Sequence, residues 1–427
     1  MDTQQFTTKS PGILGNRFIR TIILSNVLLQ IGIWVRNFAI LLYVSEKTNN
    51  DPYAVSLISV VEFAPIFVFS FIGGTFADRW KPKRTMIWCD LLSAVSVFVV
   101  LMTILLGAWQ AVYLVTFISA ILSQFSQPSA MRLFKQHVPE EQLQQGMALF
   151  QSLAAIFMVL GPMLGTFVYT NWGLETSISI MGVAFLLSAL VLVNLPKDKE
   201  VPRTKPVKGQ FLKELAEGFR YVWRSQVLRT LGVAFMLAGL GVGLTSQAIS
   251  LFVVTERLGK PEEFLQYLFM TSGAAMLIGG GVVAAFAKRI SPQFLFAIGS
   301  FVSAICTFTI GLSTNPAVTL TAQFISGFVF PCIHIGFSTM ILKWSNEAIV
   351  GRVMGVLNPM FMGMMVLSMS FAGLLKDLFS LVALYTAASC LYLIGALVML
   401  PVMKHKAPKH HGEETQETVQ APSPVSN

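Results

Sequence analysis

Long apolar segments recur along almost the whole chain, and short polar or charged stretches separate them. Each segment has roughly 20 residues, enough for a helix to cross a hydrocarbon core of about 30 Å. The segments lack the period-two alternation of membrane-spanning strands, and a helix satisfies its own backbone hydrogen bonds in lipid. The pattern predicts an all-α membrane protein with twelve transmembrane helices, at residues 18–44, 53–77, 85–107, 109–131, 146–170, 175–195, 227–254, 264–287, 293–313, 316–342, 350–375 and 380–402.

A long polar interruption from Pro196 to about Gln226 divides these segments into two sets of six. Phe76-Ala77-Asp78-Arg79 after the second segment has a counterpart in Phe286-Ala287-Lys288-Arg289 after the eighth, which indicates two pseudo-repeated lobes. Within the interruption, apolar and charged residues alternate with helical spacing, which predicts an amphipathic helix on the membrane surface. We expect an amino-terminal lobe at 1–195, a cytoplasmic linker at 196–226, a carboxy-terminal lobe at 227–403 and a disordered cytoplasmic tail at 404–427.

Composition and charge agree with a membrane location. Hydrophobic residues make up 54% of the 427 residues and charged residues only 12%, which excludes a soluble protein. The net charge of +9 comes from Lys and Arg that gather on one side of the predicted stack. Short loops rich in these residues stay in the cytoplasm. The chain is therefore predicted to cross the cell membrane many times with both termini cytoplasmic, and the charge does not indicate nucleic-acid binding.

Other classes of protein lack support in the sequence. The four cysteines lie in separate segments without a CxxC pair, so neither a disulfide framework nor a metal site is expected. Gly279-Gly280-Gly281 is not followed by Lys-Ser or Lys-Thr, which argues against a nucleotide site. No catalytic set of residues converges in the segments, so we expect neither enzymatic activity nor a cofactor.

The charged loop from Gly73 to Arg84 resembles a motif of the major facilitator superfamily, in which Gly and Leu-Ala-Asp-Arg precede a second Gly and a basic run. Phe76 stands in place of the usual Leu, while Lys81 and Pro82 replace the later Gly and a basic residue. The resemblance covers all twelve segments and extends to Gly351-Arg352-Val353-Met354-Gly355. It implies alternating access and a cytoplasmic gate between the lobes, with solvated surface charge as the alternative. The gate residues would be Gly74, Asp78, Arg79, Lys83, Arg84, Asp90 and Arg352.

Three further stretches resemble the macrolide-efflux-like branch of drug:proton antiporters: Phe125-Ser126-Gln127-Pro128, Val138-Pro139-Glu140-Glu141-Gln142-Leu143 and Glu214-Leu215-Ala216-Glu217-Gly218-Phe219-Arg220-Tyr221. In addition, Gly161-Pro162-Met163-Leu164-Gly165 resembles the antiporter motif Gly-x-x-x-Gly-Pro-x-x-Gly-Gly, with Phe157 and Thr166 replacing its outer glycines. We expect Pro162 to kink the helix, and Gly161 and Gly165 to let a neighbouring backbone approach. An ordinary packing site is the alternative.

Charged residues deep inside membranes are rare and mark functional sites. Arg36 and Glu62 each lie roughly 12 to 14 Å from the outer end of their segments, at 1.5 Å per residue. We therefore expect them to pair, with Glu62 carrying protons and Arg36 holding it ionised, although a static ion pair would have the same pattern. His334, the only histidine in a predicted segment, is a second candidate for proton coupling or a plain bridge between helices.

Polar residues scattered among apolar ones suit a cavity for an amphiphilic ligand, and the candidates are Asn26, Gln30, Trp34, Asn37, Gln247 and Asn358. We predict a secondary active exporter of amphiphilic small molecules or drugs, driven by proton antiport and working as a monomer. The alternatives are an exporter of a specific metabolite or siderophore, a lipid or lysophospholipid transporter, and a non-transporting membrane sensor.

Overall fold

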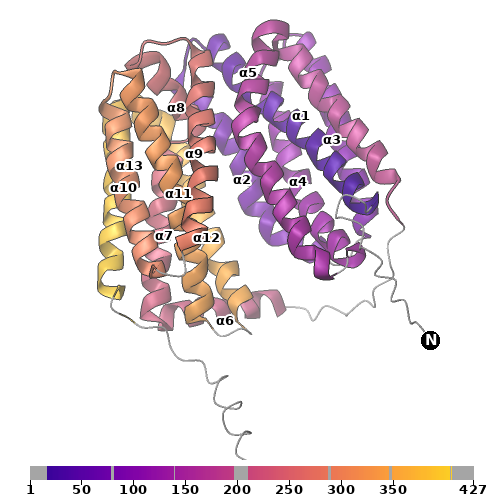
Figure 1. Cartoon of the computed structure of the whole chain (residues 1–427). Coiled ribbons are helices and arrows are strands. Elements are labelled where there is room, and N and C mark those ends of the chain that lie inside the picture. Colours follow the sequence, from indigo (N-terminus) through magenta and orange to yellow (C-terminus); the bar gives the residue numbers. More distant parts are fainter. Residues whose placement is uncertain are drawn as a thin grey trace, which may run out of the picture.

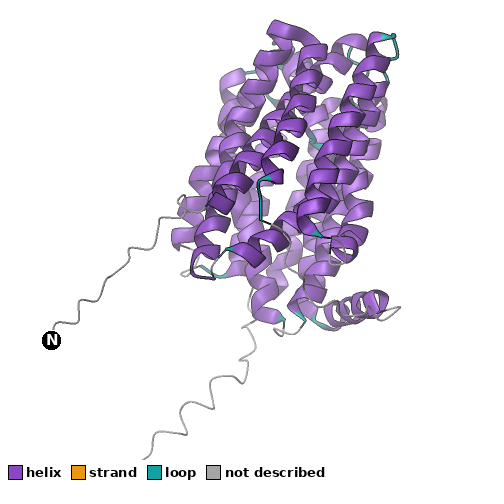
Figure 2. Cartoon of the chain, turned by 90° about the vertical axis from the view of Figure 1, so that its right-hand side faces the viewer, coloured by secondary structure: helices purple, strands orange, loops and turns teal. Residues whose placement is uncertain are grey.

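The computed structural model describes residues 17–77, 81–138, 140–196, 210–286, 290–345, 349–403 and 405. Throughout these ranges the regular secondary structure is helical (Figure 2). The amino-terminal half consists of α1 (Arg17–Lys47), α2 (Pro52–Ala77), α3 (Pro82–Leu105), α4 (Ala111–His137) and α5 (Glu140–Val193).

Helix α5 spans two of the predicted segments, which meet at a break in the helix at Gly173. The backbone of Gly173 has φ of 75° and ψ of −177°, a conformation that glycine adopts without the strain of a β-carbon. The predicted helices at 146–170 and 175–195 therefore lie on either side of this glycine.

The second half begins with α6 (Gln210–Arg224), the amphipathic helix of the linker. The elements that follow are α7 (Gln226–Leu244), α8 (Gln247–Phe252), the π-helix η2 (Val253–Arg257), the 3₁₀-helix η3 (Glu262–Phe264), α9 (Leu265–Phe286), α10 (Pro292–Leu312), α11 (Pro316–Trp344), α12 (Val350–Leu378), α13 (Leu381–Met399) and η4 (Leu400–Val402).

The prediction of one continuous helix at 227–254 is wrong, because α7 ends at Leu244 and α8 begins at Gln247. Thr245 donates its hydroxyl to the carbonyl of Gly241 at 3.0 Å, and Ser246 has extended backbone. Hydroxyl side chains that bond nearby backbone compete with helix propagation. Hydropathy does not register this competition, since both sides of the break are apolar.

Ten helices in the described part of the chain are long and apolar enough to span a membrane. The shorter apolar stretch Ala111–Gln127 adds one, and the 42-residue stretch Ser152–Val193 divides at Gly173. Together these account for twelve spans. In Figure 1 they form two lobes side by side, with α6 lying across one end of the carboxy-terminal lobe. The predicted fold class is confirmed.

Side chains on α3 are distributed as expected for a helix at the surface of a membrane protein. Leu92, Val95 and Val99 recur at helical spacing and are exposed. Asp90 and Ser93 lie on the opposite face and are buried. The apolar face is therefore the outer one, which is the reverse of a soluble helix, and the polar face of α3 points into the lobe.

The hydrophobic cores show how the two lobes meet. One cluster is shared between them, and includes Phe38 and Val55 from the first lobe with Phe252 and Leu265 from the second. Nearer the end where α6 lies, each lobe has a core of its own, one around Ile19 and the other around Leu228. The lobes are thus packed together at the end away from α6 and packed separately at the other.

Two helix pairs that approach closely between the lobes are α2 with α12 and α5 with α9. A β-carbon on Gly373 of α12 would lie 2.5 Å from the carbonyl oxygen of Pro52 on α2, and one on Gly273 of α9 would lie 2.9 Å from that of Met158 on α5. Glycine is therefore required at both places for the helices to approach this closely. Helix α2 also carries Glu62, so a candidate site residue lies on an element that joins the lobes.

Candidate functional site

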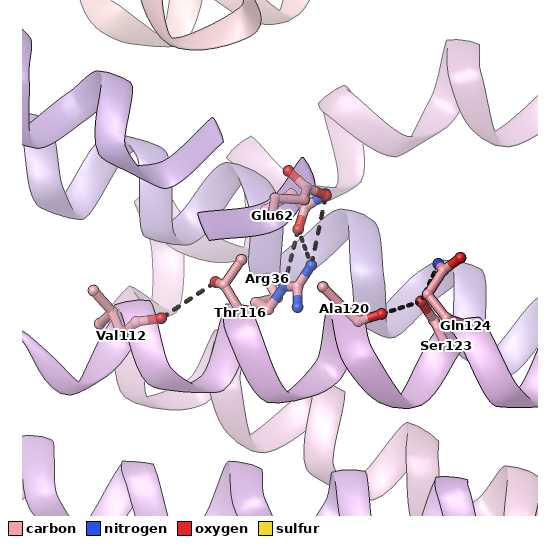
Figure 3. A network of polar contacts seen from close by, with 8 residues as sticks. Arg36, Glu62, Val112, Thr116, Ala120, Ser123 and Gln124 are labelled. Atoms are coloured by element: carbon pink, nitrogen blue, oxygen red, sulfur yellow. Dashed lines mark hydrogen bonds and ion pairs between the residues drawn. The ribbon is translucent and has the colours of Figure 1, made fainter. Parts of the chain in front are cut away.

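The structure brings Arg36 of α1 and Glu62 of α2 together (Figure 3). The side chain of Asn37 lies between them. Arg36 donates hydrogen bonds from Nε and Nη2 to Oδ1 of Asn37, the first at 2.9 Å. Asn37 in turn donates from Nδ2 to Oε1 of Glu62 at 2.9 Å, while Nη2 of Arg36 lies 3.8 Å from the same oxygen. The amide of Asn37 therefore bridges the cation and the anion, a role different from the cavity lining predicted for it.

Burial makes this cluster electrostatically sensitive. The side chain of Arg36 is 4% exposed and that of Glu62 is 21% exposed. Nη1 of Arg36 is buried and has no hydrogen-bond partner among the described residues. A buried charge is tolerated only when it is paired and hydrogen-bonded. The guanidinium therefore depends on Glu62 for a counter-ion and on Asn37 for a hydrogen-bond acceptor. Glu62 is the more exposed member of the charged pair.

The glycines of the antiporter-like motif place α1 against α5. A β-carbon on Gly161 would overlap the ring of Trp34, and one on Gly165 would lie 2.6 Å from Cβ of Phe38 and 2.7 Å from the carbonyl oxygen of Trp34. Pro162 lies between them within helical backbone. Trp34 thus packs onto a helix rather than lining the predicted cavity, and it precedes Arg36 by two positions.

A cavity of about 110 Å³ lies inside the amino-terminal lobe, between α1, α3, α4 and α5. We call it the Asp90 cavity. Two residues predicted to line a substrate cavity, Asn26 and Gln30, lie on its wall. Its other polar lining residues are Ser25, Asp90, Ser93, Ser119, Ser123, Ser126 and Gln127. The structure therefore separates the predicted cavity residues of α1 into a group at this cavity and a group around Arg36.

Asp90 is buried inside the amino-terminal lobe and is not a solvated surface charge. It is 3% exposed, and its Oδ2 accepts a hydrogen bond from Ser188 Oγ at 2.6 Å. Ser188 is 2.8 Å from Ser25 Oγ, so three buried polar side chains from α1, α3 and α5 form a chain. The contact of Asp90 with Asp78 and Arg79 at a gate stays a prediction, because both partners lie outside the described residues.

The structure describes only some of the remaining gate residues. Asp78 and Arg79 lie outside the described residues, and Gly74 is in the last turn of α2. Lys83 donates from Nζ to the carbonyl oxygen of Val193 at 2.8 Å, and Arg84 is exposed. Arg352 of α12 pairs with Glu217 of α6 at 2.8 Å. A direct latch between the loop and α12 stays a prediction.

The polar candidates of the carboxy-terminal lobe do not join the Arg36 cluster. His334 is exposed on α11, with its ring 4.8 Å from that of Phe330 and 6.1 Å from that of Phe235. Asn358 is exposed on α12, and Gln247 is half-buried at the start of α8. Their assigned roles in proton coupling and substrate binding stay predictions.

Sequence reasoning missed the bridge at Asn37 and the serines around Asp90. A usable signal exists for the serines, because Ser119, Ser123 and Ser126 recur on α4 at the spacing of one helix face. Serines at such positions in a transmembrane helix indicate a polar interior surface. No comparable signal identifies Ser188, whose contact with α3 depends on how the helices are rotated.

The sequence is similar to a known protein family and to several of its members. A model of the Major Facilitator Superfamily matches residues 22–316 and 231–426. The chain is 25% identical over 406 residues to "Uncharacterized MFS-type transporter YkuC" of Bacillus subtilis (strain 168), with 92% of each protein covered. It is 26% identical over 305 residues to macrolide efflux protein A of Streptococcus pyogenes, covering 65% of this chain and 73% of that protein. Multidrug efflux pump Tap of Mycolicibacterium fortuitum is 24% identical over 372 residues, covering 83% and 89%.

Solved structures share the fold. A POT family transporter in complex with a thioalcohol conjugated peptide matches with a TM-score of 0.73 and 14% identity, over 91% of this chain and 97% of that one. A mutant of the nucleoside transporter NupG matches with a TM-score of 0.74 and 12% identity, over 91% and 100%. At these identities the likeness extends to the arrangement of the helices alone.

Proposed function

The chain belongs to the major facilitator superfamily and is a membrane transporter rather than an enzyme, and from that premise we propose that it exports amphiphilic small molecules in exchange for protons. The observation that carries the proposal is the buried cluster of Arg36, Asn37 and Glu62 on α1 and α2. The names of two relatives, macrolide efflux protein A and multidrug efflux pump Tap, support export and an amphiphilic substrate.

Protonation of Glu62 is the proposed coupling step. It removes the negative charge that balances Arg36, whose side chain is 4% exposed. A buried cation without a counter-ion is costly, so this packing of α1 and α2 becomes less favourable once Glu62 is neutral. Because α2 also forms the contact with α12, the proton and the substrate bias one equilibrium between two arrangements of the lobes.

We further propose an orientation for the protein. Loops rich in Lys and Arg favour the cytoplasmic side of a membrane, which places α6 and both termini there. The shared hydrophobic core then lies toward the outside, and the two separate cores lie toward the cytoplasm. In this orientation the structure is closed to the outside. The localisation that follows is the cell membrane, with the lipid bilayer and a small substrate as partners.

Glu62→Gln tests the coupling. Purified wild type and variant are placed in proteoliposomes, and transport of a panel of cationic dyes that includes ethidium is followed under an imposed pH gradient. We expect the variant to lose the acceleration by the gradient and to keep downhill exchange of dye, because glutamine preserves the hydrogen bond from Asn37 but cannot exchange a proton. Retained exchange also shows that the variant is folded.

Glu256→Gln is the matched control. Glu256 pairs with Lys376 at the edge of the other lobe, and its side chain is 44% exposed. Its removal should leave gradient-driven transport unchanged. Full acceleration by the gradient in Glu62→Gln would refute proton coupling through this residue. Parallel assays with siderophores and labelled lysophospholipids distinguish the drug, metabolite and lipid classes, and absence of any uphill transport would indicate a sensor.

A further inference from the structure

The Asp90 cavity contains a carboxylate that the proposed coupling does not use. Asp90, Ser25 and Ser93 at its inner end are buried, whereas Asn26, Gln30 and Gln127 at its mouth are partly or fully exposed. The mouth is thus formed by α1 and α4, and the inner end by α3 together with Ser25 of α1. A ligand would enter between α1 and α4 and meet Asp90 at the bottom.

No protein cation balances Asp90 within the described part of the chain. Among the described residues that line the cavity, Asp90 is the one with a formal charge, and it is in none of the ion pairs. Lys83 on the same helix is about 10 Å away along the axis, at 1.5 Å per residue, and donates to the end of α5. A buried carboxylate is stable when ionised only if a cation is paired with it.

Hydroxyl groups lie beside the charge of Asp90 in the cavity. Ser188 and Ser25 form a hydrogen-bonded chain that ends on Oδ2 of Asp90, while Oδ1 has no partner among the described residues. Ser93 of α3 and Ser119 of α4 also line the cavity. An ammonium group has three N–H donors and no acceptor, so a carboxylate oxygen with nearby hydroxyl oxygens is complementary to it.

Size and apolar lining restrict what the ligand can be. A volume of about 110 Å³ is well below the roughly 300 to 1,000 Å³ of pockets that enclose drug-sized ligands, so the cavity suits a slender group rather than a whole drug molecule. Leu29, Ile33 and Phe185 also line the cavity. These side chains would cover an alkyl stem, and the aromatic ring of Phe185 also favours a nearby cation.

We propose that the Asp90 cavity binds the protonated amino group of a cationic amphiphile, with the carboxylate of Asp90 as its counter-ion. The proposal rests on the proposed function and deepens it, because it names the class of substrate as alkylammonium amphiphiles. The apolar body of the substrate stays outside the cavity. Asn26 and Gln30 then line the mouth, where they contact the stem next to the charged group.

Equilibrium binding to the purified full chain tests the proposal without any gradient. The probes are dansylcadaverine, which ends in a primary ammonium group on a slender chain, and its neutral N-acetyl derivative, and dansyl emission reports binding. Asp90→Asn should weaken binding of dansylcadaverine at least about tenfold, since a charge-assisted hydrogen bond is lost. Binding of the neutral derivative should not change.

Glu256→Gln is again the control, because it removes a carboxylate at the edge of the other lobe and leaves the Asp90 cavity unaltered. It should leave the preference for the charged probe intact. Equal loss of both probes in Asp90→Asn, or loss of neither, would overturn the proposal, and a thermal melt of each variant checks that it is folded. If the binding test fails while gradient-driven export is intact, only the proposed role of the Asp90 cavity is refuted. If the wild type binds the charged probe but never exports it, the proposed function is refuted.

Discussion

At the scale of single residues, the amino-terminal lobe depends on how a few buried charges are balanced. Arg36 and Glu62 were predicted to pair because both are charged residues at similar depth on consecutive antiparallel helices. The predicted pair is present, but its hydrogen bonds pass through Asn37. An amide can accept from a cation and donate to an anion at once, and depth along a helix does not reveal which neighbour does so.

The first prediction concerns the stability of this cluster. Glu62→Gln leaves Arg36 buried without a counter-ion, and breaking a buried pair in this way costs about 3 to 5 kcal/mol. Arg36→Met should cost less, because Glu62 is partly exposed and its charge needs a buried partner less than that of Arg36 does. The double variant should be more stable than Glu62→Gln alone. Thermal melts in detergent rank the variants by stability. Equal losses of stability in the two single variants that add up in the double variant would contradict the prediction.

At the scale of helices, close approach is decided by glycines. α1 lies against α5 because Gly161 and Gly165 leave room for Trp34 and Phe38. The sequence predicted that this pair of glycines would admit a neighbour. It did not predict that the neighbour is α1, because small residues four apart specify a face and not its partner.

The second prediction follows from this contact. Gly161→Ala would place a β-carbon inside the ring of Trp34, and overpacking of this kind costs about 1 to 3 kcal/mol. Because Trp34 is two residues from Arg36, transport should fall together with the melting temperature. Gly281→Ala is the control on α9, where no atom lies within 4 Å of the added carbon. A neutral Gly161→Ala would show that the helices separate easily.

At the scale of the whole molecule, the two lobes share one core at one end and have separate cores at the other. Polar contacts follow the same division. Ser45 of α1 donates to Oε1 of Glu262 in η3 of the opposite lobe at 3.0 Å. Alternating access requires this end to open, so the contact should be temporary during transport.

The third prediction tests that opening. Ser45→Cys and Glu262→Cys are combined in a background with Cys390→Ser, because Cys390 is the exposed one of the four free cysteines. A methanethiosulfonate cross-linker between the two new thiols should stop transport, and a reducing agent should restore it. Each single cysteine variant serves as the control. Transport at the full rate by cross-linked protein would mean that this end does not open.

The sequence by itself determined the membrane-spanning helices, their number and their division into two lobes. These depend on local hydropathy, segment length and the rise of a helix, which need no knowledge of neighbours. Only the tertiary structure decided that Asn37 bridges the pair, that Trp34 packs on Gly161, and that Asp90 meets Ser188, 98 residues away. Such contacts depend on the rotation and crossing of helices, because in lipid an apolar face carries no information about which other helix it will contact.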